Sequence, residues 1–424
     1  MKLKGLILVL LAAVALRSCA PDPSPEAFLV PEISGITVDE GTPGAVEFRC
    51  NVSSMSQVAE YGLYFTTAGT ATKASSDIRS WTRVQGVRSG DEDAVSVRID
   101  DLLGGATYSC RLFIGNGRVE RLSEPLSYSA PDNGSGLPPM RLLVEPGSGG
   151  KVCLPICGAL KCVVDWGDGI REAYIGDYGA GALATDYVSH IYEIPDASSG
   201  PTSNYEPAYL EEPPLFEVKI SGKVPALSTG GLSACDCIRE VLDWGETGLE
   251  DMSSAFKGCR SLEELAAPGP DTFAGVRSFQ GAFNGTSLIS LPSNLFESAG
   301  GISELNETFK DCPYLESLPE GLLSPLAGLE RMVSTFAGCK SLTSIPASFF
   351  DSNLSLRSME GVFMNCTSLT GESPYTEING SRIHLYERNL HPVIFAPVER
   401  TYLCFFGCLG LSDYDTIPHN WKKP

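Results

Sequence analysis

The chain has 424 residues, of which 43% are hydrophobic, so it is long enough to form two or three domains that each bury a core. Its formal net charge of −21 at pH 7 would repel nucleic acid and argues against such a partner. With only four histidines and no nucleophile-elbow, phosphate-loop or zinc-hydrolase motif, it is predicted to be a non-enzymatic protein without cofactor or metal.

The N-terminus has the pattern of an export signal. Two lysines precede an apolar run of 11 residues, Leu6 to Leu16, which has the length of a signal-peptide core and is too short to span a bilayer. The following residues, Leu16-Arg17-Ser18-Cys19, resemble a bacterial lipobox, which implies lipidation of Cys19; ordinary secretory cleavage nearby is the alternative. We therefore predict a signal peptide over 1–18, a proline-rich tether over 19–27, and attachment to the outer membrane or cell surface through a lipid anchor only.

Residues 28–130 consist of short alternating segments separated by turn residues, which predicts a β-sandwich. The run Leu102-Leu103-Gly104-Gly105-Ala106-Thr107-Tyr108 resembles the approach to the sixth strand of a fibronectin type III domain. Cys50 and Cys110 each lie in a strand-like segment of this region, and they are the best candidates for a disulfide in an exported chain.

A linker rich in Pro, Gly and Ser follows at 131–139, and a second β-rich block extends over 140–225. This block resembles a PKD-like module, because Asp165-Trp166-Gly167-Asp168-Gly169 is followed by Ser189-His190-Ile191-Tyr192. Asp165 and Asp168 could contribute to a calcium site, although calcium prefers six or more oxygen ligands. The alternative is a hairpin turn built on Gly and Asp and anchored by Trp166.

Residues 226–424 contain a repeated apolar signature, in which phenylalanines recur 27, 26, 27 and 27 residues apart. The spacing i, i+3, i+7 predicts a short helix in each unit. The second residue after each Phe is Gly, Asp or Asn, which predicts a left-handed cap, and a brief extended segment ending in Pro follows. The five copies are Leu249/Met252/Phe256, Val276/Phe279/Phe283, Ile302/Leu305/Phe309, Leu329/Met332/Phe336 and Leu356/Met359/Phe363, with a degenerate sixth at Phe405.

The run from Met252 to Leu262 resembles the leucine-rich repeats of the Bacteroides surface protein A-like (BspA-like) family, and the resemblance covers roughly residues 235–424. It implies a surface lipoprotein that adheres to a host matrix protein or to another bacterial macromolecule. The fold class predicted for the chain is multidomain: two N-terminal β-sandwich-like modules, then an α/β leucine-rich-repeat solenoid over 226–424 that ends in a C-terminal cap.

Most of the 14 cysteines do not fit a disulfide pattern. Five of them occupy one repeat position, so we expect a ladder of reduced, buried thiols with parallel side chains. These are Cys259, Cys312, Cys339, Cys366 and Cys408. Five more lack the paired spacing of a zinc site: Cys153, Cys157, Cys162, Cys235 and Cys237.

An insertion at 371–395 interrupts the period of the repeats. It carries His384, Tyr386, Arg388 and His391 close together in the sequence. The segment is interpreted as part of the cap that closes the core, because terminal repeats are often atypical. A binding insertion is the alternative.

A binding face is predicted from the polar positions inside the Leu-x-x-Leu runs, whose side chains have no role in the core. These positions are Glu263, Glu264, Ser290, Glu316, Ser317, Thr343 and Ser344. The leading hypothesis is an adhesin that binds a host or bacterial macromolecule through this face. The alternative is a polysaccharide-binding lipoprotein of the outer membrane with an aromatic platform of Tyr375, Tyr386, Tyr402 and Trp421. A third hypothesis, a glycan hydrolase, rests only on the many carboxylate pairs.

Overall fold

The computed structural model describes residues 32–423 apart from 43–44, 54, 68–77, 79–80, 89–92, 101, 117–119, 132–136, 148, 180–187, 195–213 and 231–234. The predicted signal peptide, Cys19 and the proline-rich tether lie outside the described residues, as does most of the predicted linker 131–139. The chain divides into two compact units: residues 1–135 together with 171–174 form the first, and the remaining residues form the second.

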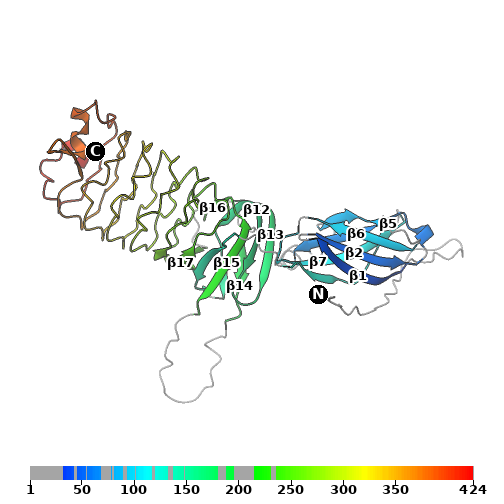
Figure 1. Cartoon of the computed structure of the whole chain (residues 1–424). Coiled ribbons are helices and arrows are strands. Elements are labelled where there is room, and N and C mark those ends of the chain that lie inside the picture. The colour runs from blue at the N-terminus through cyan, green and yellow to red at the C-terminus, as the bar shows by residue number, and fades with distance from the viewer. Residues whose placement is uncertain are drawn as a thin grey trace, which may run out of the picture. The chain divides into compact units, whose positions relative to one another are not determined.

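The first unit contains two antiparallel sheets (Figure 1). One has the strand order β1-β2-β6-β5, and the other has the order β4-β3-β7-β8 with β9 also paired to β7. Alternate residues of β2 are buried, as expected for a strand with one face on a core. The bounds are β1 Ile33–Thr42, β2 Ala45–Val52, η1 Met55–Gln57, β3 Glu60–Thr67, β4 Thr82–Gln85, β5 Val87–Arg88, β6 Ala94–Ile99, β7 Thr107–Gly115, β8 Glu120–Leu122 and β9 Leu126–Ser129.

Tyr108, at the start of β7, closes the corner that leads into this strand. Its ring is buried, and its hydroxyl accepts a hydrogen bond from the backbone N–H of Leu103 at 2.9 Å. A tyrosine near the start of this strand, bonded to the backbone a few residues upstream and two residues before a cysteine, is the tyrosine corner of immunoglobulin-like sandwiches. The hydrogen bond fixes the backbone where the chain passes from one sheet to the other.

Cys50 in β2 and Cys110 in β7 belong to different sheets, and both are free thiols. The candidate disulfide is therefore not formed in this structure. Both side chains are buried among apolar neighbours, and burial raises the pKa of Cys50 to about 11 and the pKa of Cys110 to about 12. They act as small core side chains, which is the usual behaviour of buried reduced cysteine.

A larger sheet has the strand order β13-β12-β15-β10-β17-β18, in which β16 also pairs with β12. Its strands belong to the second unit, apart from residues 171–174 of β13. Strand β10 pairs antiparallel with β15 and β17, and β17 pairs parallel with β18. The bounds are β10 Met140–Val144, β11 Lys151–Cys153, β12 Ile156–Asp165, β13 Arg171–Tyr178, β14 Ser189–Ile191, β15 Phe216–Lys223, β16 Ala226–Leu227, β17 Ile238–Asp243 and β18 Glu264–Leu265.

Strand β17 carries this sheet into the repeats. It pairs with β10 on one side and with β18, from the first repeat, on the other, where Glu240 lies opposite Glu264. Trp244 follows β17 directly, is buried, and lies edge-on to Phe256 with ring centroids 6.1 Å apart. The β-rich block and the repeats therefore share one hydrogen-bonded sheet.

The structure contradicts the predicted α/β class of the repeats. The five apolar signatures contain turns where helices were expected, and the described residues include one α-helix, α2 (His419–Lys422), and two 3-10 helices, η1 and η5 (Leu385–Leu390). Phe256 donates its backbone N–H to the carbonyl of Ala282 in the next coil at 2.7 Å, whereas an α-helix would require Met252 as the acceptor. The described part of the chain is nearly all β-strand and turn.

Two left-handed residues in each coil explain why no helix forms. One is the second residue after the Phe, as the sequence predicted, and the prediction is confirmed at Gly258, Gly285, Asp311, Gly338, Asn365 and Gly407. The other is the second residue before the Phe, at Ser254, Gly281, Glu307, Ser334, Gly361 and Leu403. A left-handed residue inside the signature interrupts a right-handed helix. The i, i+3, i+7 spacing therefore marks successive turns of an irregular coil.

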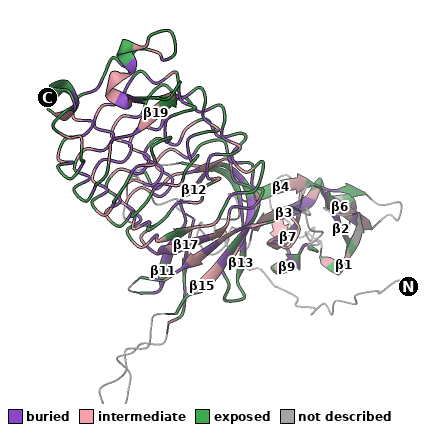
Figure 2. Ribbon diagram, turned by 60° about the vertical axis from the view of Figure 1, so that its left-hand side comes forward, coloured by how far each residue is buried: buried purple, intermediate pink, exposed green. Residues whose placement is uncertain are grey.

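The repeated phenylalanines form one buried column along the stack of coils. Buried positions recur in successive coils of the ribbon (Figure 2). Consecutive rings are stacked, with centroids 5.3 to 5.9 Å apart and interplanar angles of 3° to 13°. Trp244 closes one end of the column, and Trp421 of α2 stacks on Phe405 at the other, 6.2 Å away. Each coil thus covers the apolar face of the next one.

The repeated cysteines lie beside this column as free, buried thiols. Each thiol from the third coil onward donates a hydrogen bond to the carbonyl of the Phe in the preceding coil; for Cys312 the acceptor is Phe283, at 3.1 Å. The second coil has Thr286 in place of Cys, and its hydroxyl donates to the same Phe283 carbonyl at 2.9 Å. The thiols therefore give these buried carbonyls a further hydrogen bond, since the carbonyls of Phe283, Phe336 and Phe363 already accept the backbone N–H of the third residue after them.

The free energy of unfolding is expected to fall as the pH rises from 9 towards 11. Burial raises the pKa of Cys312 from 9.0 to about 11, so in this window the unfolded chain has released the thiol proton while the folded chain keeps it. The stability contributed by the neutral thiol is complete below pH 9 and is lost at about 1.4 kcal/mol per pH unit above it. Denaturant titrations at pH 8 and 10.5 should show Cys312→Ala losing about 2 kcal/mol less than the wild type. If the wild type and Cys312→Ala lose the same free energy of unfolding between the two pH values, the raised pKa of Cys312 is contradicted.

The insertion at 371–395 forms a hairpin of β19 (Tyr375–Ile378) and β20 (Ser381–His384), followed by η5. Arg388 of η5 is buried, and its guanidinium donates to the carbonyls of Phe350 at 2.7 Å and Asn353 at 2.9 Å. Burial lowers the pKa of Arg388 to about 10. The insertion is therefore attached to the stack by a buried cation.

Candidate functional site

The predicted binding-face residues lie in two adjacent rows on the stack. One residue of each coil forms a backbone ladder that runs through Glu263, Ile289, Glu316, Thr343 and Thr370, with one N–H···O bond of 2.8 to 3.3 Å between successive coils. The residues that follow the first four members of this ladder form the second row: Glu264, Ser290, Ser317 and Ser344. The structure brings together the seven predicted residues, Glu263, Glu264, Ser290, Glu316, Ser317, Thr343 and Ser344.

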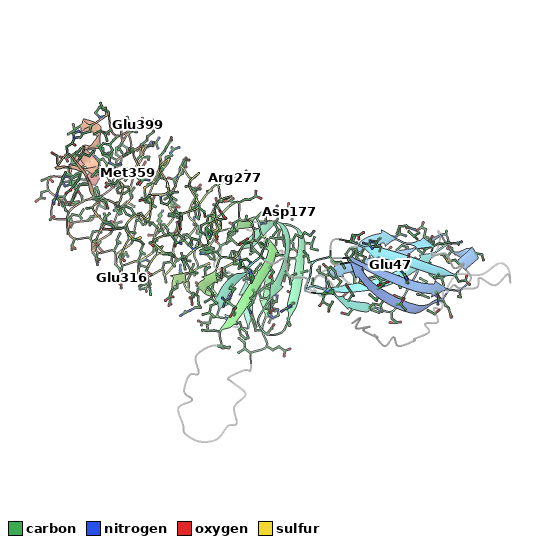
Figure 3. All side chains as sticks on the ribbon, viewed as in Figure 1. Glu47, Asp177, Arg277, Glu316, Met359 and Glu399 are labelled. Atoms are coloured by element: carbon green, nitrogen blue, oxygen red, sulfur yellow. The ribbon has the colours of Figure 1, made fainter. Side chains whose placement is uncertain are left out.

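This face, defined by those seven residues, is solvent-exposed except at Glu263, which is half-buried and pairs with Arg239 at 3.2 Å. Glu316 projects from the outer surface of the stack (Figure 3). Neither Glu264 nor Glu316 makes an ion pair or a side-chain hydrogen bond with another described residue. Ile289, 43% exposed, adds an apolar group within the first row. The face is therefore acidic and hydroxyl-rich. Its side chains are available to a partner except for Glu263, which pairs with Arg239, and Thr343, whose hydroxyl donates to the carbonyl of Glu316 at 3.1 Å.

The predicted aromatic platform is not present. Trp421 is buried against Phe405 and belongs to the core. Tyr375 lies under the guanidinium of Arg382 at 4.5 Å, and Tyr386 stacks on a histidine ring, so both are engaged within the insertion. Tyr402 is half exposed and has no aromatic partner among the described residues. The sequence indicated aromatic residues near one another, but most of them are used to pack the end of the stack.

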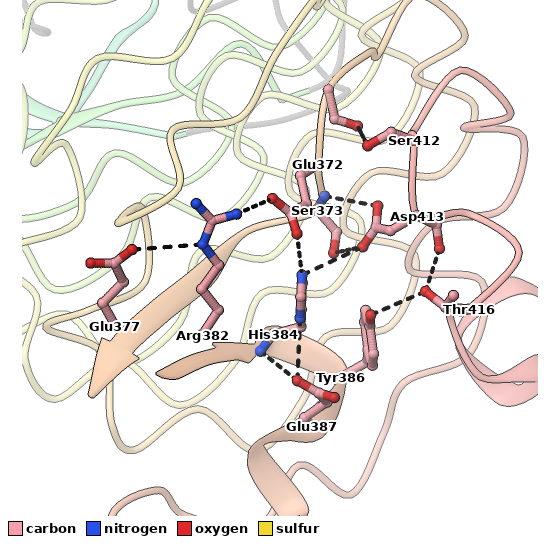
Figure 4. Close-up of polar contacts among 11 residues, drawn as sticks. Glu372, Ser373, Glu377, Arg382, His384, Tyr386, Glu387, Ser412, Asp413 and Thr416 are labelled. Atoms are coloured by element: carbon pink, nitrogen blue, oxygen red, sulfur yellow. Dashed lines mark hydrogen bonds and ion pairs between the residues drawn. The ribbon is translucent and has the colours of Figure 1, made fainter. Parts of the chain in front are cut away.

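A polar cluster surrounds His384 at the end of β20 (Figure 4). Its Nε2 lies 3.0 Å from an oxygen of Glu372 and 3.8 Å from Asp413, and its Nδ1 lies 3.2 Å from Glu387. Tyr386 stacks on the ring with centroids 5.1 Å apart. The sequence drew attention to His384 and Tyr386 but not to Glu372 or Asp413. Asp413 comes from the last coil, and no local pattern indicates that the insertion folds onto it.

The geometry of this cluster is not that of a nucleophilic site. The hydroxyl of Ser373 donates to Asp413 and makes no hydrogen bond with the imidazole, so the histidine is not placed to remove its proton. No group of three or more His, Cys, Asp or Glu side chains among the described residues is arranged to hold a metal ion. The cluster is best explained as a set of polar contacts that holds the insertion against the last coil.

The carboxylates of Asp165 and Asp168 take part in the turn after β12. Asp165 accepts the N–H of Gly167 at 3.1 Å, and Asp168 accepts the N–H of Ile170 at 3.0 Å. The second oxygen of Asp168 lies 2.7 Å from Nε2 of His190, whose ring stacks on Trp166. These contacts fit the hairpin interpretation, because backbone amides and a histidine already occupy the carboxylates that a calcium ion would need.

No protein-family model, no curated protein and no solved structure matches this chain. Among the described residues, none of the helices has the length and apolar character needed to cross a membrane.

Proposed function

We propose that the chain is a non-enzymatic binding protein of a bacterial cell surface, in which the stack of coils presents the acidic, hydroxyl-rich face to a host matrix protein or to another bacterial surface macromolecule. One observation carries the proposal: seven polar side chains from four successive coils lie in two adjacent rows, and none of them has a role in the core. Stacked repeats recognise partners through such extended surfaces.

The surface location rests on the sequence alone. The apolar run of residues 6–16 and the lipobox-like Leu16-Arg17-Ser18-Cys19 support export and a lipid anchor at Cys19. A single acyl chain binds a membrane only reversibly, so stable attachment would need a second chain on the same cysteine or a further contact. Metabolic labelling with a palmitate analogue tests the anchor, because a Cys19→Ala variant should lose the label.

Replacing Glu316 by Lys together with Ser317 by Arg is expected to reduce capture of the full chain by at least about tenfold. The new cations repel the basic groups of a partner that pairs with the acidic face, and the longer side chains keep the two surfaces apart. Capture is measured by biolayer interferometry on immobilised laminin, collagen and fibrinogen, and on whole bacterial cells. Both residues are exposed, so the fold should be unchanged.

The double variant Ser324→Arg/Glu330→Lys is the matched control, since both residues are also exposed and outside the face, and the charge change of +3 is the same. It should leave capture unchanged. Equal loss in the control would show that net charge, rather than this face, is responsible. If the wild-type chain is captured by none of these surfaces, the proposal is wrong.

A further inference from the structure

A groove of about 620 Å³ opens on the first three coils of the stack, at a position distinct from the acidic face. It lies at the equivalent turn of each coil, just after the column Phe, and its volume falls within the range of about 300–1,000 Å³ typical of small-ligand sites. The lining residues come in three groups: Lys257, Gly258 and Arg260; Asn284, Gly285, Thr286 and Ser287; and Asp311, Pro313 and Tyr314.

The middle of the groove is formed by the second coil, which is one residue shorter than its neighbours. That coil has Asn284-Gly285-Thr286-Ser287 at the turn and lacks the cysteine of its neighbours. Thr286 turns inward, is fully buried and occupies the position of the missing thiol. The floor of the groove is therefore a short turn of small residues, whereas its two rims carry Arg260 and Tyr314.

The groove is lined by two basic residues, Lys257 and Arg260, and one acidic residue, Asp311. Lys257 and Arg260 make no ion pair and no side-chain hydrogen bond with another described residue. Other basic side chains of these coils are paired: Arg277 with Glu250 at 3.9 Å, and Lys310 with Glu307 at 3.2 Å. In a chain of net charge −21, two unpaired cations in one depression create a local site for an anion.

The same groove has an aromatic rim and short hydrogen-bonding groups. Tyr314 is 58% exposed, and its hydroxyl has no hydrogen-bond partner among the described residues. Asn284 uses its amide N–H₂ on Glu307 at 3.3 Å and keeps its carbonyl oxygen as an acceptor. An exposed ring can pack against the C–H face of a sugar, and hydroxyls of the sugar can bond to amide, hydroxyl and carboxylate groups such as Asp311.

We propose that this groove binds an acidic sugar unit, a uronate, within a glycan. Lys257 and Arg260 hold the carboxylate, Arg260 through paired N–H donors, and Tyr314 packs against the sugar ring. A polyphosphate such as nucleic acid is disfavoured, because its dense charge meets the repulsion of the whole acidic chain. The proposal goes beyond the proposed function and stands whether or not the acidic face binds a protein.

Isothermal titration of the full chain with tetragalacturonate and with a hyaluronan tetrasaccharide tests the proposal. At least one of these uronate probes should bind, and methyl esterification of its carboxylates, which removes the charge and keeps the sugar, should weaken binding by about tenfold or more. Raising the salt concentration should weaken binding of the acid but not of the ester.

Lys257→Ala, Arg260→Ala and Tyr314→Ala should each weaken binding by about tenfold. Lys340→Ala is the matched charge control, because Lys340 occupies the position of Arg260 in the fourth coil and lies outside the groove; Phe406→Ala, also exposed, is the control for the aromatic ring. Neither control should change affinity.

Absence of binding to both acids at millimolar concentration would overturn the proposal, and so would equal affinity for acid and ester or full binding by the Lys257→Ala/Arg260→Ala double variant. The groove variants should leave capture on matrix proteins and cells unchanged, and Glu316→Lys/Ser317→Arg should leave uronate binding unchanged. Failure of one proposal is thus distinguishable from failure of the other.

Discussion

Replacing Phe309 by Ala is expected to lower the free energy of unfolding of the second unit by about 3–5 kcal/mol. Phe309 is fully buried at the middle of the column, stacked between Phe283 at 5.3 Å and Phe336 at 5.4 Å. The substitution removes a large apolar side chain and both ring contacts, and the neighbouring coils cannot close the gap because their own rings are fixed by the stack.

Denaturant unfolding followed by tryptophan fluorescence measures this loss, since Trp244 and Trp421 lie at the two ends of the column. Phe406→Ala is the matched control: the side chain is the same, but Phe406 is 41% exposed, and the expected loss is below about 1 kcal/mol. A loss of similar size in the two variants would show that the column does not hold the coils together.

Replacing Arg388 by Ala is expected to destabilise the second unit by about 3 kcal/mol and to release the insertion. Without the guanidinium, the carbonyls of Phe350 and Asn353 lose their bonds of 2.7 and 2.9 Å, and the ring of Phe395 loses the cation that lies 4.4 Å from its centre. Hydrogen exchange should accelerate in the hairpin β19–β20 while the column coils stay protected.

Arg388→Met separates packing from hydrogen bonding, because methionine fills similar space without donating. If the bonds matter, this variant should be weakened nearly as much as Arg388→Ala. If it is as stable as the wild type, the guanidinium contributes through packing alone, as replacements of buried ionic groups sometimes show. Unchanged exchange in the hairpin of both variants would contradict the anchoring role.

The sequence predicted the repeat period and the left-handed cap but not the path of the backbone between them. Phenylalanines about 27 residues apart predict a stack of similar coils. Gly258 and Asn365 are residue types that favour a left-handed backbone conformation, so they predict a turn. Ser254, Glu307 and Leu403 give no such indication, yet each is left-handed and prevents a helix. The apolar spacing that suggests a helix is also produced by turns whose amides bond to the next coil.

The alignment of the seven polar residues was predictable because it follows from periodicity alone: residues at one repeat position must align when coils stack. The groove and the cluster at His384 were not. The groove is lined by residues of three coils, and no local pattern indicates that they enclose a depression. The cluster depends on Asp413, which is distant in the sequence and is brought in by the folded insertion.

The tryptophans at the two ends of the aromatic column restrict where a coil can be added to the stack or removed from it. Trp244 covers Phe256 on the side of the β-rich block, and Trp421 covers Phe405 on the other, so neither terminal ring offers a free surface on which another unit could be placed. Duplication or deletion of an interior coil would therefore change the length of the stack and leave both tryptophan contacts in place.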